Sequence, residues 1–130
     1  MDSTEKVSVN MNIGTLSQID LLVDLGYYSN RSDFINQSVR QVLEQKRAII
    51  EGETQRHLSY NENWFTGICV FTEEQLQHVR VSGQKIKLRG YGLAVIDKNL
   101  DELALETIEA IDVKGKVLCS EPVKKHFGLK

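Results

Sequence analysis

Polar side chains with hydrogen-bonding groups alternate with apolar side chains near the N-terminus, in the stretch from Lys6 to Asn12. Because successive side chains of a strand point to opposite faces, this alternation predicts a strand with one polar and one apolar face. The polar face carries Lys6, Ser8, Asn10 and Asn12, and the apolar face carries Val7, Val9 and Met11. Such a short strand is not stable alone, so we expect the same strand of a second copy to pair with it. The resulting ribbon fits the width of the DNA major groove, where its polar groups can bind base edges.

A first amphipathic helix is predicted to follow this strand. Thr15 or Ser17 can cap it, and it runs to about Leu25. Gly26 is expected to end the helix, because glycine adopts the positive φ of a helix C-terminus without strain. Its apolar residues recur at spacings of three and four and form a single stripe. That stripe consists of Leu16, Ile19, Leu22 and Val23.

A second helix is predicted to begin near residue 30. Asn30 with Asp33 three residues later resembles a capping box, and Ser29 is the alternative cap. The helix can continue through residues 48–50, and Gly52 is expected to stop it. Its apolar face carries Phe34, Ile35, Val39, Val42 and Leu43. The strand and two helices are too few residues for a monomeric core, so dimerisation is the simplest way to bury both stripes.

The second half of the chain carries strand-like patterns separated by glycines. Residues 53–63 are polar and are expected to be a linker or a helix extension, residues 64–71 a strand, and residues 72–76 a short capped helix. An apolar-x-apolar-x-glycine pattern is typical of short strands that end in sharp turns. The pattern occurs at residues 79–83, 86–90 and 111–115. It predicts a small β-rich domain, either solenoid-like or compact and antiparallel, in which residues 99–106 form a helical turn or a loop.

Several classes of protein do not fit the sequence. No apolar run approaches the ~20 residues of a membrane span, and the N-terminus lacks a signal pattern, so we expect a cytoplasmic protein without a membrane partner. Cys69 and Cys119 are far apart and are predicted to be buried thiols. His57, His78 and His126 lack metal-ligand spacing, so no metal and no cofactor are expected. Without a phosphate-binding loop or a nucleophile elbow, the chain is not expected to be an enzyme.

The order of strand, helix, glycine turn and capped helix resembles the ribbon-helix-helix family of DNA-binding proteins. The stretch from Val7 to about Gln45 is similar to the DNA-binding domains of the plasmid copy-number repressor and its relatives. The most specific part is the turn and helix start in residues 26–35, where Arg31-Ser32-Asp33 precedes two apolar residues. The resemblance covers roughly a third of the chain and implies a β-α-α fold that is intertwined as a homodimer.

The resemblance also implies which side chains contact double-stranded DNA. Base contacts fall on Lys6, Ser8 and Asn10, and phosphate contacts on Ser29, Asn30 and Arg31. Asn10 can pair with adenine through two hydrogen bonds, Lys6 can donate to guanine, and Ser8 can serve either base. The backbone amides at the start of the second helix suit a phosphate, to which Arg31 adds a charge-assisted contact.

The charge of the chain argues against strong non-specific DNA binding. The whole chain has a formal net charge of -2, and residues 1–50 hold five Lys and Arg against six Asp and Glu, a net of -1. Useful affinity is therefore expected to need several dimers side by side. A later basic group can touch DNA or an anionic ligand, or can simply be a solvated face. It consists of Arg80, Lys85, Lys87 and Arg89.

The sequence thus predicts an α+β protein: a ribbon-helix-helix DNA-binding and dimerisation domain over residues 1–52, a linker or helix extension over 53–65, and a β-rich domain for oligomerisation or sensing over 66–130. The expected function is that of a sequence-specific transcriptional repressor, acting as a homodimer or higher oligomer. One alternative is an antitoxin that regulates its own operon and binds a toxin through its C-terminal half. Another is an assembly module whose ribbon only dimerises. Regularly spaced apolar residues and glycine turns favour a folded second half over a disordered, toxin-binding tail.

Overall fold

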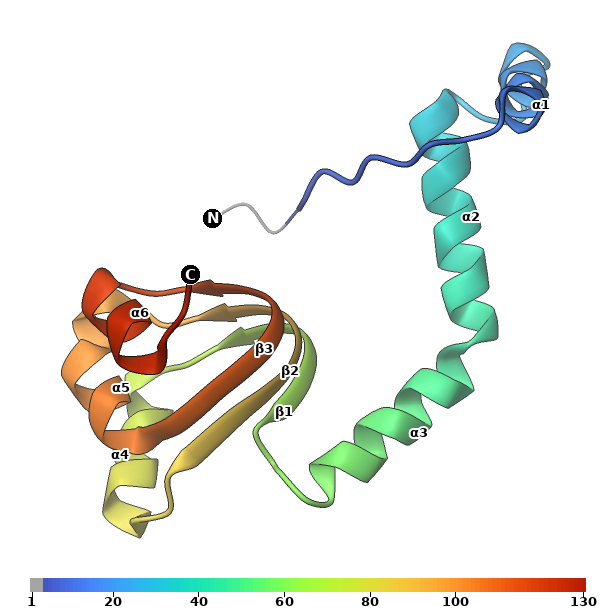
Figure 1. The fold of residues 1–130 in the computed structure, drawn as a ribbon. Coiled ribbons are helices and arrows are strands. Elements are labelled where there is room, and N and C mark those ends of the chain that lie inside the picture. The colour runs from blue at the N-terminus through green and yellow to red at the C-terminus, as the bar shows by residue number, and fades with distance from the viewer. Residues whose placement is uncertain (1–3) are drawn as a thin grey trace. The chain divides into compact units, whose positions relative to one another are not determined.

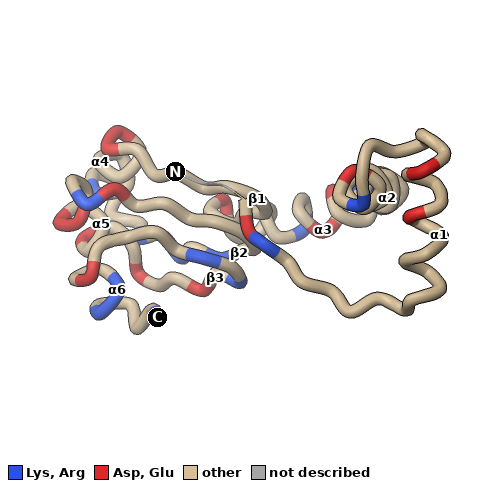
Figure 2. The backbone as a smooth tube through the Cα atoms, turned by 90° about the horizontal axis from the view of Figure 1, so that it is seen from above, with Lys and Arg blue, Asp and Glu red and all other residues tan. Residues whose placement is uncertain are grey.

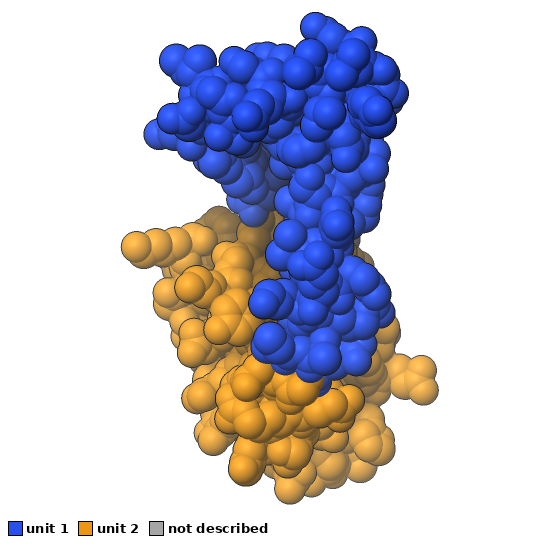
Figure 3. All heavy atoms as spheres, turned by 90° about the vertical axis from the view of Figure 1, so that its right-hand side faces the viewer, with its two compact units in different colours: residues 1–51 blue, residues 52–130 orange. Residues whose placement is uncertain are grey.

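The computed structural model describes residues 4–130, and the chain divides into two compact units, residues 1–51 and 52–130 (Figure 3). The N-terminal unit contains α1 (Ile13–Asp24), α2 (Arg31–Gln45) and the first residues of α3 (Arg47–Leu58). The C-terminal unit contains the rest of α3 and a repeated arrangement of strands and helices (Figure 1).

Helix α1 begins earlier than the sequence predicts. Its N-cap is Asn12, whose side-chain oxygen accepts a hydrogen bond from the Gly14 N–H at 2.8 Å. The predicted caps, Thr15 and Ser17, are wrong because both lie inside the helix, where the Ser17 hydroxyl donates to the Ile13 carbonyl. The predicted end is confirmed: Gly26 has a φ of 87°, and its N–H donates to the Val23 carbonyl.

Helix α2 begins as predicted, because the Asn30 side chain accepts a hydrogen bond from the Asp33 N–H at 2.8 Å. It ends at Gln45, and after Lys46 the chain enters α3. The prediction that Gly52 stops a helix is wrong, since Gly52 lies within α3. The glycine is tolerated there because the helix continues for another turn and a half, with an ion pair between Glu53 and Arg56 at 2.8 Å.

The segment before α1 forms neither helix nor strand in this single chain over residues 4–12. The strand expected at residues 6–12 is therefore not present here. A strand is defined by its ladder of backbone hydrogen bonds, and within the described residues no other segment forms such a ladder with this one. The intermolecular ribbon stays a prediction about two chains.

The C-terminal unit is a parallel sheet with a helix after every strand. The strands β1 (Trp64–Val70), β2 (Ile86–Val95) and β3 (Ile108–Leu118) pair in that order. They are followed by α4 (Glu73–Ser82), by the 3-10 turn η1 (Lys98–Leu100) with α5 (Asp101–Thr107), and by α6 (Glu121–Phe127). The helices lie on one side of the curved sheet (Figure 1). Residues 66–130 are thus a mixed α/β repeat rather than the expected β-rich domain, and the antiparallel alternative is wrong.

A row of glycines marks the bend of this sheet. Gly67, Gly92 and Gly115 stand at paired positions of the three strands, with φ values of 113°, 127° and 145°. A Cβ atom on Gly92 would lie 2.0 Å from the Gly67 carbonyl oxygen, and one on Gly115 would lie 2.1 Å from that of Gly92. Only glycine fits at positions 92 and 115. Gly90 and Gly115, which were predicted to end strands, lie inside β2 and β3 instead.

Two of the three predicted glycine units lie in strands, at residues 86–90 and 111–115. The third, residues 79–83, is instead the end of α4, where Gly83 is the left-handed C-cap with a φ of 77°. The pattern misled here because apolar residues two apart also occur on a helix. The predicted start of α4 is confirmed by a capping box between Thr72 and Gln75.

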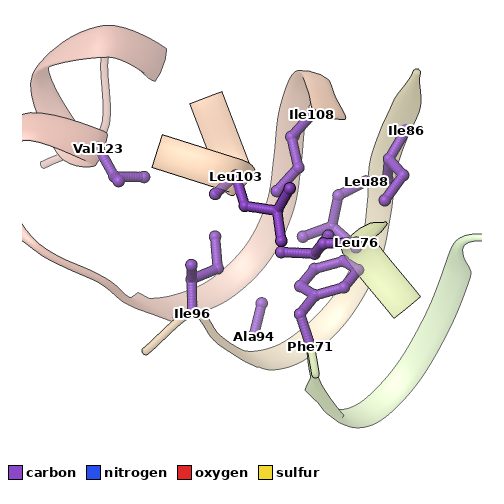
Figure 4. Close-up of a cluster of buried hydrophobic side chains, with 10 residues drawn as sticks. Phe71, Leu76, Ile86, Leu88, Ala94, Ile96, Leu103, Ile108 and Val123 are labelled. Atoms are coloured by element: carbon purple, nitrogen blue, oxygen red, sulfur yellow. The ribbon is translucent and has the colours of Figure 1, made fainter. Parts of the chain in front are cut away.

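The core of the C-terminal unit lies between the inner face of the sheet and the three helices (Figure 4). Leu88 and Ala94 of β2, Leu76 of α4 and Val123 of α6 are fully buried members of this one cluster. The remaining buried members are Phe71, Ile86, Ile96, Leu103, Ala104 and Ile108. The strands and helices therefore fold as one packed unit that is stabilised mainly by burial of aliphatic side chains.

The two cysteines, Cys69 and Cys119, are free thiols that are partly rather than fully buried. Burial raises the pKa of both thiols. Within residues 4–130, no group of three or more His, Cys, Asp and Glu side chains is placed to hold a metal ion. The same residues include no helix long and apolar enough to cross a membrane.

Candidate nucleic-acid interface

The residues predicted to contact bases lie on the exposed segment that leads into α1. Lys6, Ser8 and Asn10 are all solvent-exposed, and Val7 and Val9 between them are 79% and 74% exposed. Asn12 differs from the other members of the predicted polar face because its side chain caps α1. The segment thus offers three free polar side chains and two uncovered valines directly before a fixed helix start.

The N-terminal unit does not cover its own apolar surface. Among residues 4–51, the single buried side chain is Ile19, with 4% of its surface exposed. Many aliphatic side chains of the same unit are exposed by more than a third. They are Ile13, Leu21, Leu25, Ile35, Val39, Val42, Leu43, Ile49 and Ile50. An apolar surface of this kind marks an interaction site rather than the outside of a stable monomer.

Arg31, the first residue of α2, is held by Asp20 of α1. Its Nε donates to Asp20 Oδ1 at 2.8 Å, and its terminal nitrogen donates to Oδ2 at 2.9 Å. The side-chain hydrogen bond from Arg31 lowers the pKa of Asp20. Both side chains remain about half exposed, so the guanidinium can still face a phosphate on its open side. Local sequence patterns do not reveal this pair, because its members lie eleven positions apart on either side of a turn.

The start of α2 is arranged around the carboxylate of Asp33. Asp33 Oδ2 accepts the Ser29 N–H at 3.0 Å, and Oδ1 accepts the Gln37 side-chain amide at 2.9 Å. These two hydrogen bonds, from Gln37 first and Ser29 second, lower the pKa of Asp33. The structure thus brings Ser29, Asn30 and Arg31 together at the helix start. It also places a carboxylate there, which occupies the Ser29 amide that was predicted to bind a phosphate.

The turn between the two helices is fixed by an aromatic pair. The rings of Tyr28 and Phe34 meet edge to face, with their centroids 4.9 Å apart. Together with the Arg31–Asp20 pair, this contact sets the angle between α1 and α2 within the unit. Helix α1 itself carries acidic residues and no Lys or Arg, as Figure 2 shows. Positive charge near the candidate phosphate site therefore comes mainly from α2.

Of three comparisons with known proteins, one gives a match and two do not. No curated protein and no solved structure matches the chain. The model of the ribbon-helix-helix transcriptional regulator family matches residues 2–124, which include both compact units almost completely. The match therefore extends well past the N-terminal third that carries the resemblance in the sequence. The chain belongs to the ribbon-helix-helix transcriptional regulator family.

Proposed function

We propose that the chain is a sequence-specific transcriptional repressor that binds double-stranded DNA as a homodimer. In this proposal, residues 6–12 of two chains pair as an antiparallel ribbon and enter the major groove. The observation that carries the proposal is the exposed segment before α1. Its polar side chains are free for bases, while Val7 and Val9 lie uncovered beside two helices that bury a single residue of their own.

The proposed contacts separate base reading from positioning on the phosphate backbone. Asn10 and Ser8 supply paired donors and acceptors for adenine edges, and Lys6 donates to guanine. At the start of α2, Arg31 binds a phosphate with the side of its guanidinium that Asp20 leaves open. This second contact fixes the register of the dimer but carries no sequence information.

The proposed affinity depends on assembly, because the N-terminal residues are slightly acidic. Non-specific binding to DNA is driven by Lys and Arg that displace counterions, and residues 1–50 have a net charge of -1. We therefore infer that the C-terminal unit joins dimers into a higher oligomer or controls their binding. Because this unit has a packed core, the antitoxin alternative with a disordered toxin-binding tail gains no support from it.

The decisive experiment compares the wild type with the double variant Ser8→Ala/Asn10→Ala. Preferred sites are selected from random duplexes, and their affinity is measured against scrambled duplexes at several salt concentrations. The proposal predicts a preference in the wild type that falls by about tenfold or more in the variant, since each lost base pairing costs ~1–3 kcal/mol. Sedimentation should show that the variant remains a dimer.

A matched control replaces a hydroxyl side chain and an amide side chain of the C-terminal unit by alanine. Thr66→Ala/Asn99→Ala also removes two exposed polar side chains and should leave the site preference unchanged. If the wild type binds no duplex even at low salt, the chain is not a DNA-binding repressor. If it binds all duplexes equally, sequence-specific reading by the ribbon is excluded.

A further inference from the structure

A groove in the C-terminal unit brings basic and aromatic side chains together. It has a volume of about 850 Å³ and lies between residues 57–64, which include the end of α3, and residues 84–89, which lead into β2. All of these residues belong to the same compact unit. The volume lies within the range of small-molecule sites in proteins, ~300–1,000 Å³.

Aromatic rings line one side of this groove. The His57 ring of α3 stacks on the Trp64 ring, with centroids 4.5 Å apart and an angle of 4° between the planes. Tyr91, which does not itself line the groove, meets the Trp64 ring edge-on, with the two centroids 6.2 Å apart. Tyr60, also at the groove, is 86% exposed and offers a free ring face. Such a ring can stack on a flat heterocycle.

Three cations also line the groove, and one of them, Arg89, is the cross-strand partner of Trp64. Lys85, Lys87 and Arg89 alternate along the entry to β2, at a spacing of ~6–7 Å between successive positions. Within the described residues, none of the three forms an ion pair, and Glu62 is the one acid that lines the groove. Arg80 does not belong to this group, contrary to the sequence pattern. It lies on α4, where it contacts Gln77 and Glu106.

The wall of the groove is fastened to the sheet. The Asn61 side chain donates to the Lys87 carbonyl at 2.7 Å, and its own oxygen accepts the Asn63 N–H at 2.9 Å. The Trp64 N–H donates to the Asn61 carbonyl at 3.1 Å. These bonds fix the segment before β1 relative to the strand that carries Lys87 and Arg89, so the groove is held in shape without a ligand.

We propose that this groove binds a free nucleotide, with its phosphates on Lys85, Lys87 and Arg89 and its base on Tyr60. Unpaired Lys and Arg side chains at close spacing suit a di- or triphosphate, which carries several negative charges. An exposed aromatic ring beside them suits the flat base of the same molecule. A site that bound phosphate alone would have no use for the ring, and the groove's volume is large enough for one nucleotide.

The groove also has a place in regulation, an inference that rests on the proposed function. His57 lies on α3, and the first residues of that helix belong to the N-terminal unit. A ligand that moves the His57–Trp64 pair would therefore act on the one helix shared by the two units. The nucleotide is in this view an effector that changes the affinity of the N-terminal unit for DNA.

The test uses Trp64, the one tryptophan of the chain, as a reporter inside the groove. The full-length protein is titrated with purine and pyrimidine mono-, di- and triphosphates at constant ionic strength. Fluorescence and calorimetry should give the same saturable binding curve for at least one nucleotide. The Lys87→Gln/Arg89→Gln variant should bind at least about tenfold more weakly, because charge-assisted hydrogen bonds are lost.

Two further variants keep the test informative. Lys114→Gln/Lys116→Gln removes the same charge from the neighbouring strand β3 and should leave nucleotide binding unchanged. Tyr60→Leu replaces an exposed side chain, so folding should be preserved while nucleotide affinity falls severalfold. If the Lys87/Arg89 variant binds as well as the wild type, the groove is not the site.

Other probes identify the occupant. Inorganic triphosphate and the unphosphorylated nucleoside should each bind more weakly than the nucleotide. Equal binding of inorganic triphosphate, or no saturable binding of any nucleotide, would overturn the proposal. So would tighter binding of a short single-stranded oligonucleotide, which would make the occupant a nucleic-acid strand. None of these measurements uses operator DNA, and the Ser8→Ala/Asn10→Ala variant should bind the nucleotide normally, so the two proposals fail independently.

Discussion

Arg31 and Asp20 join the two helices of the N-terminal unit through a pair of hydrogen bonds of 2.8 and 2.9 Å. The pair lies at the start of α2, where the proposed phosphate contact is made. In the proposed complex the same guanidinium serves two anions, the carboxylate of Asp20 within the chain and a phosphate of bound DNA. Asp20 orients Arg31, but its negative charge also repels that phosphate.

Replacing Asp20 by asparagine should strengthen DNA binding. Asp20→Asn removes one negative charge beside the phosphate site and releases the Arg31 guanidinium, so affinity should rise by roughly threefold to tenfold at low salt. The increase should shrink at higher salt, because the gain is electrostatic. Electrophoretic or anisotropy titrations at two salt concentrations measure both effects.

The control for this prediction is Asp24→Asn, which removes the same charge from the last residue of α1. If Asp24→Asn raises the affinity as much as Asp20→Asn does, net charge alone explains the result. In that case the Arg31–Asp20 pair has no specific role in DNA binding.

The hydrogen bonds to Asp33 should make the N-terminal unit less stable in acid. Gln37 and Ser29 hold the pKa of Asp33 below its usual value of 3.8. A carboxyl with a lower pKa in the folded state stabilises that state above its unfolded pKa, and this stability is lost as the pH falls through the folded pKa. The melting temperature of wild type should thus exceed that of Asp33→Asn at pH 6.

This difference should disappear as the pH falls from about 4 to 2. Melting curves followed by circular dichroism across this range provide the measurement. A difference that persists unchanged at pH 2 would mean that the asparagine acts through helix capping or packing rather than through the ionised carboxylate. Glu5→Gln, in the segment before α1, is the control for the loss of one negative charge from the same unit at pH 6.

The sequence predicted local structure best where one residue type has one physical role. Gly26 ends α1, Asn30 caps α2 and Thr72 caps α4, because backbone geometry and cap hydrogen bonds depend on a few neighbours. The prediction failed at Gly52, where helix continuation outweighs the weak propensity of glycine.

The parallel sheet could not be predicted from local patterns. Pairing of Gly67, Gly92 and Gly115 brings together residues more than twenty positions apart, and no local spacing reveals that register. The Arg31–Asp20 pair escaped prediction for the same reason. The sequence reveals only the basic residues of the groove, because Lys85, Lys87 and Arg89 alternate visibly. Their proximity to His57 and Trp64 depends on the fold.

Two glycine substitutions should have opposite effects on stability. Gly92→Ala places a Cβ 2.0 Å from the Gly67 carbonyl and forces alanine to a φ of 127°, so it should destabilise the C-terminal unit by about 3 kcal/mol or more. Gly52→Ala meets no atom within 4 Å inside α3 and should stabilise the helix by ~0.5–1 kcal/mol. Denaturant unfolding followed by Trp64 fluorescence and circular dichroism distinguishes them. A neutral Gly92→Ala would show that the sheet is not bent at this row.

In the proposed dimer, Val9 is the position of the N-terminal segment at which a charge should weaken association most. Val9 is 74% exposed in the single chain and is expected to be covered when two segments pair. Burial of one valine side chain contributes ~1.5–3 kcal/mol to the free energy of association. A two-fold dimer buries Val9 of both chains, so the contribution is doubled. Val9→Asp should therefore raise the dimer dissociation constant by at least about a hundredfold, as sedimentation equilibrium would show.

Val81→Asp is the matched control, because Val81 is 85% exposed on α4 of the other unit. If both variants remain dimeric, the two chains do not associate through paired N-terminal strands, and an interface in the C-terminal unit must hold them together.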